Sequence, residues 1–311
     1  MKDFLAKVLK YPIKIFNIIY SKNFYGKRKK YLQKDIESDI PSNKNICVIS
    51  PHVDDETIGL GAAMINMVNR GCNVDIIYVT DSSAFSLKIE KNELKELRRL
   101  EALKIKDIIG IREILTLNVE DGKDFTYPFK AQENLEKIFS EKNYDIIYAP
   151  FLIDAHNKHL ISTKLTVEAM KNINFKNELI LYETNIPINE KLINVIYPMD
   201  REVFAKKTKL YNAFETQKIS YDFDVYELLS KVRKNYLKGS YAVEVCVKMD
   251  YKNALSFIDF QKTSKYNPHI FPRTGNHRVL YKQFFKMPAE KYFYDDILYD
   301  ILNKNKNKNK A

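Results

Sequence analysis

The chain has 311 residues, of which 45% are hydrophobic, 13% aromatic and 29% charged, a composition that excludes a disordered or collagen-like protein. The net charge of +11 is concentrated at the ends, because residues 1–34 carry +9 and residues 303–311 carry +4, which leaves −2 for residues 35–302. Since affinity for nucleic acid comes from clustered Lys and Arg, we expect no general nucleic-acid binding by the central part of the chain.

The first 43 residues are predicted to be an N-terminal extension with a basic amphipathic helix. One face of the helical wheel carries Phe4, Leu5, Val8, Leu9, Pro12, Ile13, Phe16 and Ile19, and the other carries Lys7, Lys10, Lys14 and Asn17. Two interpretations stay open. The helix packs on its own domain, or it lies on an anionic membrane surface together with the basic run at residues 26–30.

From residue 45 onward, short β-rich runs alternate with longer helical runs, which is typical of βαβ units. The predicted strands are residues 45–50, 74–79, 113–117, 144–149 and 178–183. The predicted helices between them are residues 57–70, 88–109, 129–142 and 160–173. We therefore expect an α/β fold, a Rossmann-like three-layer α/β/α sandwich with a mostly parallel sheet, in which ligands bind beyond the carboxyl ends of the strands.

Residues 251–311 are predicted to form a C-terminal extension, because the alternation ends near residue 250. The extension contains a Pro-rich aromatic segment, a helical run near residues 288–302 and an Asn/Lys tail that we expect to be disordered. It could form a packed subdomain or a substrate lid, in which case His269, Arg273 and His277 are the residues that could reach the mouth of a site.

The three cysteines are widely spaced and form no CxxC motif, which argues against a disulfide framework and against a thiolate zinc site. No run approaches the roughly 18 uncharged apolar residues of a membrane-spanning helix, and lysines interrupt the apolar N-terminal region. We therefore expect neither a spanning helix nor a signal peptide, and a cytoplasmic protein.

Three of the five histidines follow two of the predicted strands: His52 after the first, and His156 and His159 after the fourth. A hydrolytic metal site needs a few N and O ligands and an open position for water. His52, Asp55 and His159 supply two imidazoles and one carboxylate, and Asp54 is then left to accept the proton of the water. This ligand set suits one divalent ion, with Zn²⁺ expected and Fe²⁺ the alternative.

A purely structural interpretation competes with the metal site. In it, His52 caps the following helix, while Asp54 and Asp55 occupy the first turn, where acids are favoured. That interpretation needs a separate explanation for His156 and His159, which follow another strand. The pairing of the two strand ends therefore favours the metal site.

The sequence PHVDDE at residues 51–56 resembles the PHPDDE signature of the PIG-L (LmbE-like) deacetylases, metal-dependent enzymes that act on N-acetylglucosamine-containing substrates. Further segments resemble the family in the same order: Thr80-Asp81, RRLEA at 98–102, LNVEDG at 117–122, DAHNKH at 154–159, a K…A…Q pattern at Lys209, Ala213 and Gln217, and YAVE at 241–244. The resemblance implies a deacetylase domain over residues 44–250.

The resemblance also implies roles for individual residues: the metal ligands His52, Asp55 and His159, the general base Asp54, His156 at the oxyanion or the leaving amine, and substrate-binding Arg98 and Asp121. Two structural interpretations are equally good alternatives to these last roles: Arg98 as an ordinary charge on the surface of a helix, and Asp121 as an ordinary turn residue. The chain departs from the family at Val53, which replaces Pro, and at Lys158, which replaces an Asp that orients His156. We expect Lys158 to lower the pKa of His156 and Asp154 to take over the orienting role.

The sequence thus predicts a hydrolase of linear amides that removes the N-acetyl group from an N-acetylglucosamine-type sugar conjugate through metal-activated water, in glycan biosynthesis. Residues 1–34 would attach it peripherally to the inner face of an anionic membrane. The alternative is a catalytically impaired Rossmann-like binding protein, or a membrane-associated scaffold of the same fold. A nucleotide-binding protein is disfavoured, because no GxGxxG follows the first strand.

Overall fold

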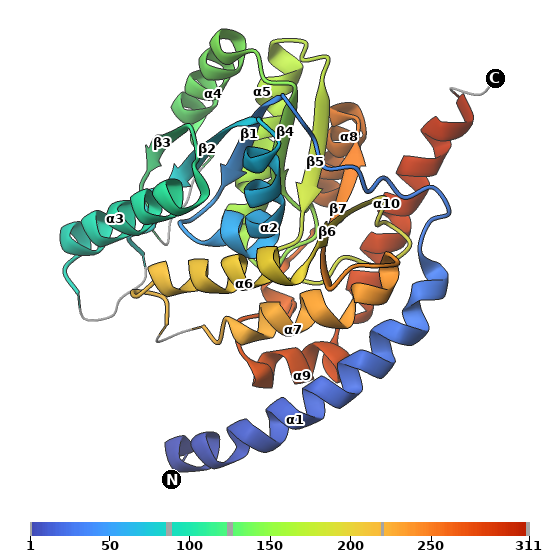
Figure 1. Ribbon diagram of the computed structural model, residues 1–311. Coiled ribbons are helices and arrows are strands. Elements are labelled where there is room, and N and C mark those ends of the chain that lie inside the picture. The colour runs from blue at the N-terminus through green and yellow to red at the C-terminus, as the bar shows by residue number, and fades with distance from the viewer. Residues whose placement is uncertain (1, 85–88, 123–126, 219–220, 309–311) are drawn as a thin grey trace.

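The computed structural model describes residues 2–84, 89–122, 127–218 and 221–308. Its centre is a seven-stranded sheet with the order β3-β2-β1-β4-β5-β7-β6 (Figure 1). The parallel strands are β1 (Asn45–Ser50), β2 (Asn73–Thr80), β3 (Glu113–Val119), β4 (Ile146–Pro150) and β5 (Glu178–Tyr182). β7 (Ala242–Met249) is antiparallel to both of its neighbours, β5 and β6 (Val195–Met199). The predicted mostly parallel sheet is confirmed.

Helices cover both faces of this sheet. One layer contains α2 (Asp55–Asn69), α3 (Lys91–Ile109) and α6 (Arg201–Leu210), and the other contains α4 (Phe129–Lys142), α5 (Asn157–Asn172) and α8 (Tyr251–Thr263). Successive strand residues point to opposite faces, so Ile46 and Val48 join the core of the first layer while Cys47 and Ile49 join that of the second. The three-layer α/β/α sandwich is therefore confirmed.

The N-terminal helix α1 (Lys2–Arg28) lies along α7 (Asp224–Val232) and α9 (His277–Lys286) (Figure 1). Its inner face buries Asn17, Ser21 and Tyr25. The Asn17 amide donates a 2.6 Å hydrogen bond to the His277 carbonyl, and Arg28 Nε lies 2.5 Å from Glu190 Oε2. The helix is thus packed on its own chain, as one of the two interpretations predicted. The faces differ from the prediction, because Asn17 of the predicted polar face is buried while Ile19 of the apolar face is exposed.

Among the described residues, the remaining elements are α10 (Ala289–Lys308) and four short 3₁₀ helices at Lys29–Tyr31, Tyr211–Ala213, Lys234–Tyr236 and Pro268–Ile270. We expected a disordered tail from residue 303, but α10 includes residues 303–308, and residues 309–311 lie outside the described part of the chain. Within the described ranges, no helix combines the length and the apolar character that crossing a membrane requires.

Candidate active site

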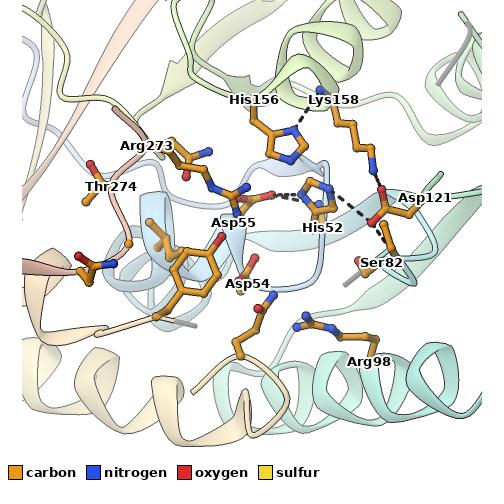
Figure 2. A pocket seen from close by; sticks show the side chains of 17 residues that line it. His52, Asp54, Asp55, Ser82, Arg98, Asp121, His156, Lys158, Arg273 and Thr274 are labelled. Carbon is orange, nitrogen blue, oxygen red and sulfur yellow. Dashed lines mark hydrogen bonds and ion pairs between the residues drawn. The ribbon is translucent and has the colours of Figure 1, made fainter. Parts of the chain in front are cut away.

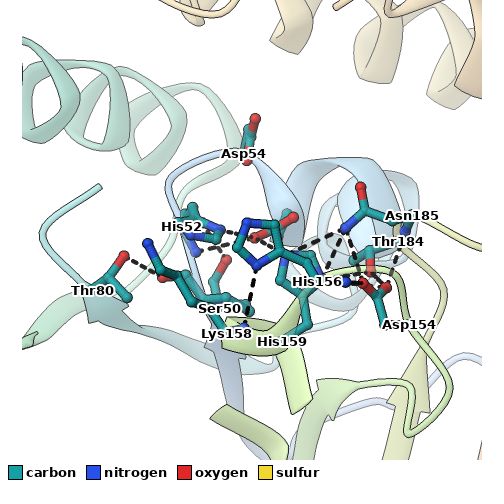
Figure 3. Close-up of polar contacts among 12 residues, drawn as sticks. Ser50, His52, Asp54, Thr80, Asp154, His156, Lys158, His159, Thr184 and Asn185 are labelled. Carbon is teal, nitrogen blue, oxygen red and sulfur yellow. Dashed lines mark hydrogen bonds and ion pairs between the residues drawn. The ribbon is translucent and has the colours of Figure 1, made fainter. Parts of the chain in front are cut away.

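The candidate site lies where β1 and β4 are neighbours, the point at which the strand order changes direction. β1 leads into the loop that carries His52 and Asp54, and β4 leads into the loop that carries His156. Figure 3 shows the side chains of the two loops gathered at one edge of the sheet. The parallel pairing of β1 with β4 therefore brings together segments that are about a hundred residues apart in the sequence.

Three potential metal ligands converge at this edge: His52, Asp55 and His159. Their ligand atoms all lie within 4.8 Å of one another. Asp55 Oδ2 is 3.0 Å from His52 Nδ1 and 3.2 Å from His159 Nε2. Two imidazole nitrogens and one carboxylate are donors that suit Zn²⁺ and Fe²⁺ alike. The residues present therefore fit the divalent ion that the sequence predicts.

The charges around these ligands favour a cation. Burial alone would raise the pKa of Asp55, but His159 and His52 outweigh it and hold this pKa well below its usual range. Burial would lower the pKa of His159, yet Asp55 and Asp154 raise it to about 10. Burial lowers the pKa of His52 to about 4, so that its ring is neutral at neutral pH. The two carboxylates thus stabilise positive charge at this point.

Asp154 holds His159 from the side opposite the ligand group (Figure 3). Its Oδ2 lies 3.4 Å from His159 Nδ1 and accepts a 2.7 Å hydrogen bond from the Thr184 hydroxyl. A carboxylate in this position orients a ligating histidine and raises its basicity. We expected Asp154 to orient His156, whereas the structure places Asp154 against the ring of His159 and the backbone N–H of His156, which donates at 2.7 Å.

Asp54 is the acid of the motif that lines the pocket without belonging to the ligand group. Its φ of 141° is rare for an L-residue and costs about 1–3 kcal/mol. Glu56 Oε2 fixes the turn by accepting hydrogen bonds from the Asp54 N–H (3.2 Å) and the Ser50 hydroxyl (3.0 Å). Burial and the neighbouring Asp55 raise the pKa of Asp54 well above its usual range, against the opposing effect of Arg98. Asp54 lines the pocket outside the ligand group, where its carboxylate can accept a proton from water.

His156 and Lys158 lie on the β4 side of the pocket. The His156 Nδ1 accepts a 3.2 Å hydrogen bond from the Lys158 backbone N–H, and its ring stacks on His159 at 5.1 Å. Burial, reinforced by His52 and His159, lowers the pKa of His156 to about 2. The expected direction of this shift agrees with the structure, but its cause differs, because the Lys158 side chain forms an ion pair with Asp121 (Figure 2).

The two predicted substrate-binding residues, Arg98 and Asp121, both line the pocket. Arg98 is only 2% exposed, and its Nη1 lies 3.4 Å from both the Val53 carbonyl and Glu101 Oε2. It is therefore not the surface helix charge that was the alternative. Asp121 is also buried, and its backbone N–H donates a 3.0 Å hydrogen bond to Asp81 Oδ1. Their contact with a substrate stays a prediction.

The pocket has a volume of about 400 Å³, enough for a sugar. It is also lined by Asn185 and Tyr221, which the sequence analysis did not single out, and by Gln217, which it noted only for its motif. Asn185 follows β5 almost directly. We located the first two loops by the rule that ligands bind beyond the ends of the strands. The same rule could have identified Asn185.

The C-terminal extension supplies one more wall of the pocket, residues 273–276. Of the three residues that we considered for the mouth of the site, only Arg273 lines the pocket. His277 is instead buried under α1, with its Nε2 3.3 Å from Asp224 Oδ1. His269 is exposed and is not among the residues that line the pocket.

Comparison with protein families identifies part of the chain. Residues 47–170 match the model of the PIG-L family, described as GlcNAc-PI de-N-acetylase. This range contains both loops of the site. No curated protein sequence matches the chain.

Solved structures share the fold. The N,N'-diacetylchitobiose deacetylase from Pyrococcus horikoshii is 20% identical with a TM-score of 0.57, over 70% of this chain and 89% of that one. The A40926 pseudoaglycone deacetylase Dbv21 is 15% identical with a TM-score of 0.55, over 68% and 99%. GalB, the 4-carboxy-2-hydroxymuconate hydratase from Pseudomonas putida KT2440, is 14% identical with a TM-score of 0.56, over 67% and 96%. At these identities the likeness establishes the fold, which carries more than one reaction.

Proposed function

We propose that this chain, whose residues 47–170 match the PIG-L family, is a metal-dependent hydrolase that removes the N-acetyl group from an N-acetylglucosamine-type sugar conjugate. The observation that carries the proposal is the group of His52, Asp55 and His159 beside the separate acid Asp54 in one pocket. This set provides ligands and a base at the same place, as hydrolysis of an unactivated amide needs. The deacetylases of the same fold support the choice of substrate.

In this proposal each residue has a role that follows from its surroundings. A bound divalent ion supplies Lewis-acid polarisation of the amide carbonyl and lowers the pKa of water. Asp54 takes the proton from the attacking water, because its own pKa is raised and its carboxylate is not engaged in the ligand group. His156, on the opposite wall, is neutral because its pKa is lowered, and its Nδ1 accepts the Lys158 N–H, so its Nε2–H stabilises the oxyanion. The proton that Asp54 has taken passes to the leaving amine, and Arg98 and Asp121 hold the sugar.

The finer points of the proposal concern the ion, the extent of the domain and its place in the cell. We infer Zn²⁺ as the ion, with Fe²⁺ as the alternative that the same donors suit. We infer that the deacetylase domain spans residues 44–250, since β7 completes the sheet. A cytoplasmic enzyme of glycan biosynthesis fits the three free, buried cysteines.

We also propose peripheral attachment to an anionic membrane through α1. Tyr11, Ile15, Ile18 and Ile19 are exposed on this helix although they are large and apolar. Lys22 and Lys27 farther along the helix are exposed as well. An apolar stripe beside lysines is the pattern of a helix that lies in a membrane interface.

The test of the hydrolytic function is Asp54→Asn, assayed by acetate release from an N-acetylglucosaminide with metal content measured in parallel. We expect the variant to keep its metal and to lose activity by about a hundredfold or more, the contribution of a general base. Asp107→Asn, an exposed acid on α3, is the matched control. Near wild-type acetate release by Asp54→Asn would contradict the mechanism, and a wild-type protein that binds metal but releases no acetate would favour the scaffold alternative.

A further inference from the structure

The segment that follows the last 3₁₀ helix is held firmly against the pocket. The Thr274 N–H donates a 2.8 Å hydrogen bond to the Asn185 carbonyl, and the Tyr226 hydroxyl donates to the Thr274 carbonyl at 3.0 Å. The Gly275 carbonyl accepts a 2.7 Å hydrogen bond from the Asp222 N–H. These backbone contacts fix the position of the neighbouring residue, Arg273, at the pocket wall.

Arg273 differs from the other two cations of the pocket. Arg98 lies 3.4 Å from Glu101 Oε2, and Lys158 forms an ion pair with Asp121. Arg273 forms no ion pair with any carboxylate of the described residues. Its side chain is exposed and lines the pocket.

The ring of Tyr221 supports the guanidinium of Arg273. The Arg273 Cζ lies 5.4 Å from the centre of this ring. A stacked guanidinium keeps its five N–H donors in a fixed plane, so that less side-chain freedom is lost when it binds a ligand. Figure 2 shows the side chain pointing from the C-terminal segment toward the centre of the pocket.

We propose that Arg273 is a specificity-determining residue that binds an acidic group, a phosphate or a carboxylate, carried by the N-acetylated sugar. This inference rests on the proposed function, because it uses the same pocket. A planar fork of donors matches both kinds of anion in a bidentate manner. Since no carboxylate of the described residues lies within ion-pair distance of this guanidinium, an anionic substituent of the substrate can occupy that position. The C-terminal extension thereby selects the substrate.

The experiment compares a neutral sugar with acidic ones. The probes are methyl N-acetylglucosaminide, N-acetylglucosamine 1-phosphate, N-acetylglucosamine 6-phosphate and the N-acetylglucosaminide of glycolic acid. We measure kcat/KM for acetate release and, independently of turnover, the Kd of each probe by calorimetry. The variants are Arg273→Gln and Arg273→Lys, with Arg278→Gln as the matched control, since Arg278 is exposed on α9 and does not line the pocket.

We expect the wild-type protein to prefer at least one acidic probe over the neutral one by roughly tenfold or more, the effect of one charge-assisted hydrogen-bonded pair. Arg273→Gln should remove this preference in both kcat/KM and Kd, Arg273→Lys should keep part of it, and Arg278→Gln should keep all of it. Preference for the phosphates alone, or for the glycolic acid conjugate alone, identifies the anion.

Equal Kd values for neutral and acidic probes, or a preference that survives Arg273→Gln, would overturn the inference. These outcomes differ from failure of the proposed function. If no probe releases acetate but the acidic probes still bind more tightly and lose this advantage in Arg273→Gln, the anion site stands while the hydrolytic function fails.

Discussion

Asp154 and His159 form a buried pair in which the Asp154 carboxylate orients the His159 ring toward the other metal ligands. Asp154 Oδ2 faces His159 Nδ1 at 3.4 Å, which leaves Nε2 directed at Asp55 at 3.2 Å. The ring is therefore fixed with one nitrogen toward the other ligands. Thr184 and Asn185 bind the same carboxylate and hold it in turn.

This arrangement predicts a graded loss of metal from two substitutions. His159→Ala removes a ligand and should abolish stoichiometric metal binding. Asp154→Asn keeps all three ligands but weakens the orientation of His159, so metal affinity should fall by about 10- to 100-fold. Elemental analysis and competition with a chelator measure both effects.

The controls for this prediction are His269→Ala and Asp259→Asn, which change exposed residues of the same types. Both should bind metal like the wild-type protein. Full metal content in His159→Ala would mean that the ligand assignment is incorrect. An affinity in Asp154→Asn equal to that of the wild type would mean that Asp154 has no orienting role.

At the scale of single elements, α2 is shaped by two unusual contacts. Glu244 of β7 accepts hydrogen bonds from the Ala62 and Ala63 N–H groups (2.9 and 2.8 Å). Lys207 of α6 donates to the Ile58 carbonyl at 2.8 Å and pairs with Glu244 at 2.6 Å. The two side chains of this buried ion pair thus form hydrogen bonds with the Ala62 N–H and the Ile58 carbonyl, two groups that would bond to each other in an undisturbed helix.

The lysine of this pair is a residue that the sequence analysis did not single out. The K…A…Q pattern was placed on Lys209, but Lys209 is exposed, and the buried lysine that contacts the YAVE segment is Lys207. The spacing of residues along the sequence could not show which of the two lysines is buried. The choice depends on which face of α6 meets α2, and this is decided by contacts between elements that are far apart in the sequence.

A matched pair of glycines in α2 gives a prediction about stability. A Cβ at Gly59 would lie 2.3 Å from the Tyr182 ring and 2.6 Å from the Glu183 carbonyl, whereas a Cβ at Gly61 would meet its nearest neighbours, on Lys207 and Thr57, at 3.4 Å. Gly59→Ala should therefore lower the free energy of unfolding by about 1–3 kcal/mol through overpacking. Gly61→Ala should change it little or raise it by up to about 1 kcal/mol, because Ala favours the helix.

Thermal and urea unfolding of the two variants measure this difference. The Gly59 position also fixes how closely the start of α2, with Asp54 and Asp55, approaches β5. We therefore expect Gly59→Ala to lose metal affinity as well, and Gly61→Ala to keep it. Equal melting temperatures for the two variants would contradict the close approach.

At the scale of the whole molecule, the sequence predicted the layers because βαβ units leave a local signal. Each of the five parallel strands is a short apolar run between helices. The two antiparallel strands, β6 and β7, were not among the predicted strands, and Pro198 in β6 is a residue that weakens a strand pattern. Arg273 could be named only as one of three residues able to reach the site, because its place at the pocket depends on how the C-terminal extension folds back over the site.

The packing of α1 on the body of the molecule changes how its proposed membrane contact is best tested. Deletion of residues 1–34 would also remove the buried residues Asn17, Ser21 and Tyr25 and the ion pair of Arg28 with Glu190. Loss of binding after the deletion could then reflect a disturbed fold. Substitutions on the exposed stripe avoid this problem, since they leave the packed face intact.

We predict that Ile15→Ser with Ile19→Ser weakens binding to anionic vesicles. These side chains are 58% and 68% exposed, so the change removes apolar surface available to the membrane without opening the core. Ile108→Ser on α3 is the matched control, because Ile108 is 59% exposed on a helix of the sandwich. Sedimentation with phosphatidylserine-containing vesicles and with neutral vesicles, at low and high salt, gives the readout.

Each Lys or Arg near an anionic surface contributes about 1 kcal/mol, and salt screens this attraction. Residues 1–34 carry +9, so binding of the wild-type protein should be strong at low salt, fall at high salt and be weak on neutral vesicles. The double variant should bind less at every salt concentration, while Ile108→Ser should bind like the wild type. No sedimentation at low salt, or equal binding by the double variant, would leave α1 as a helix whose only contact is its own chain.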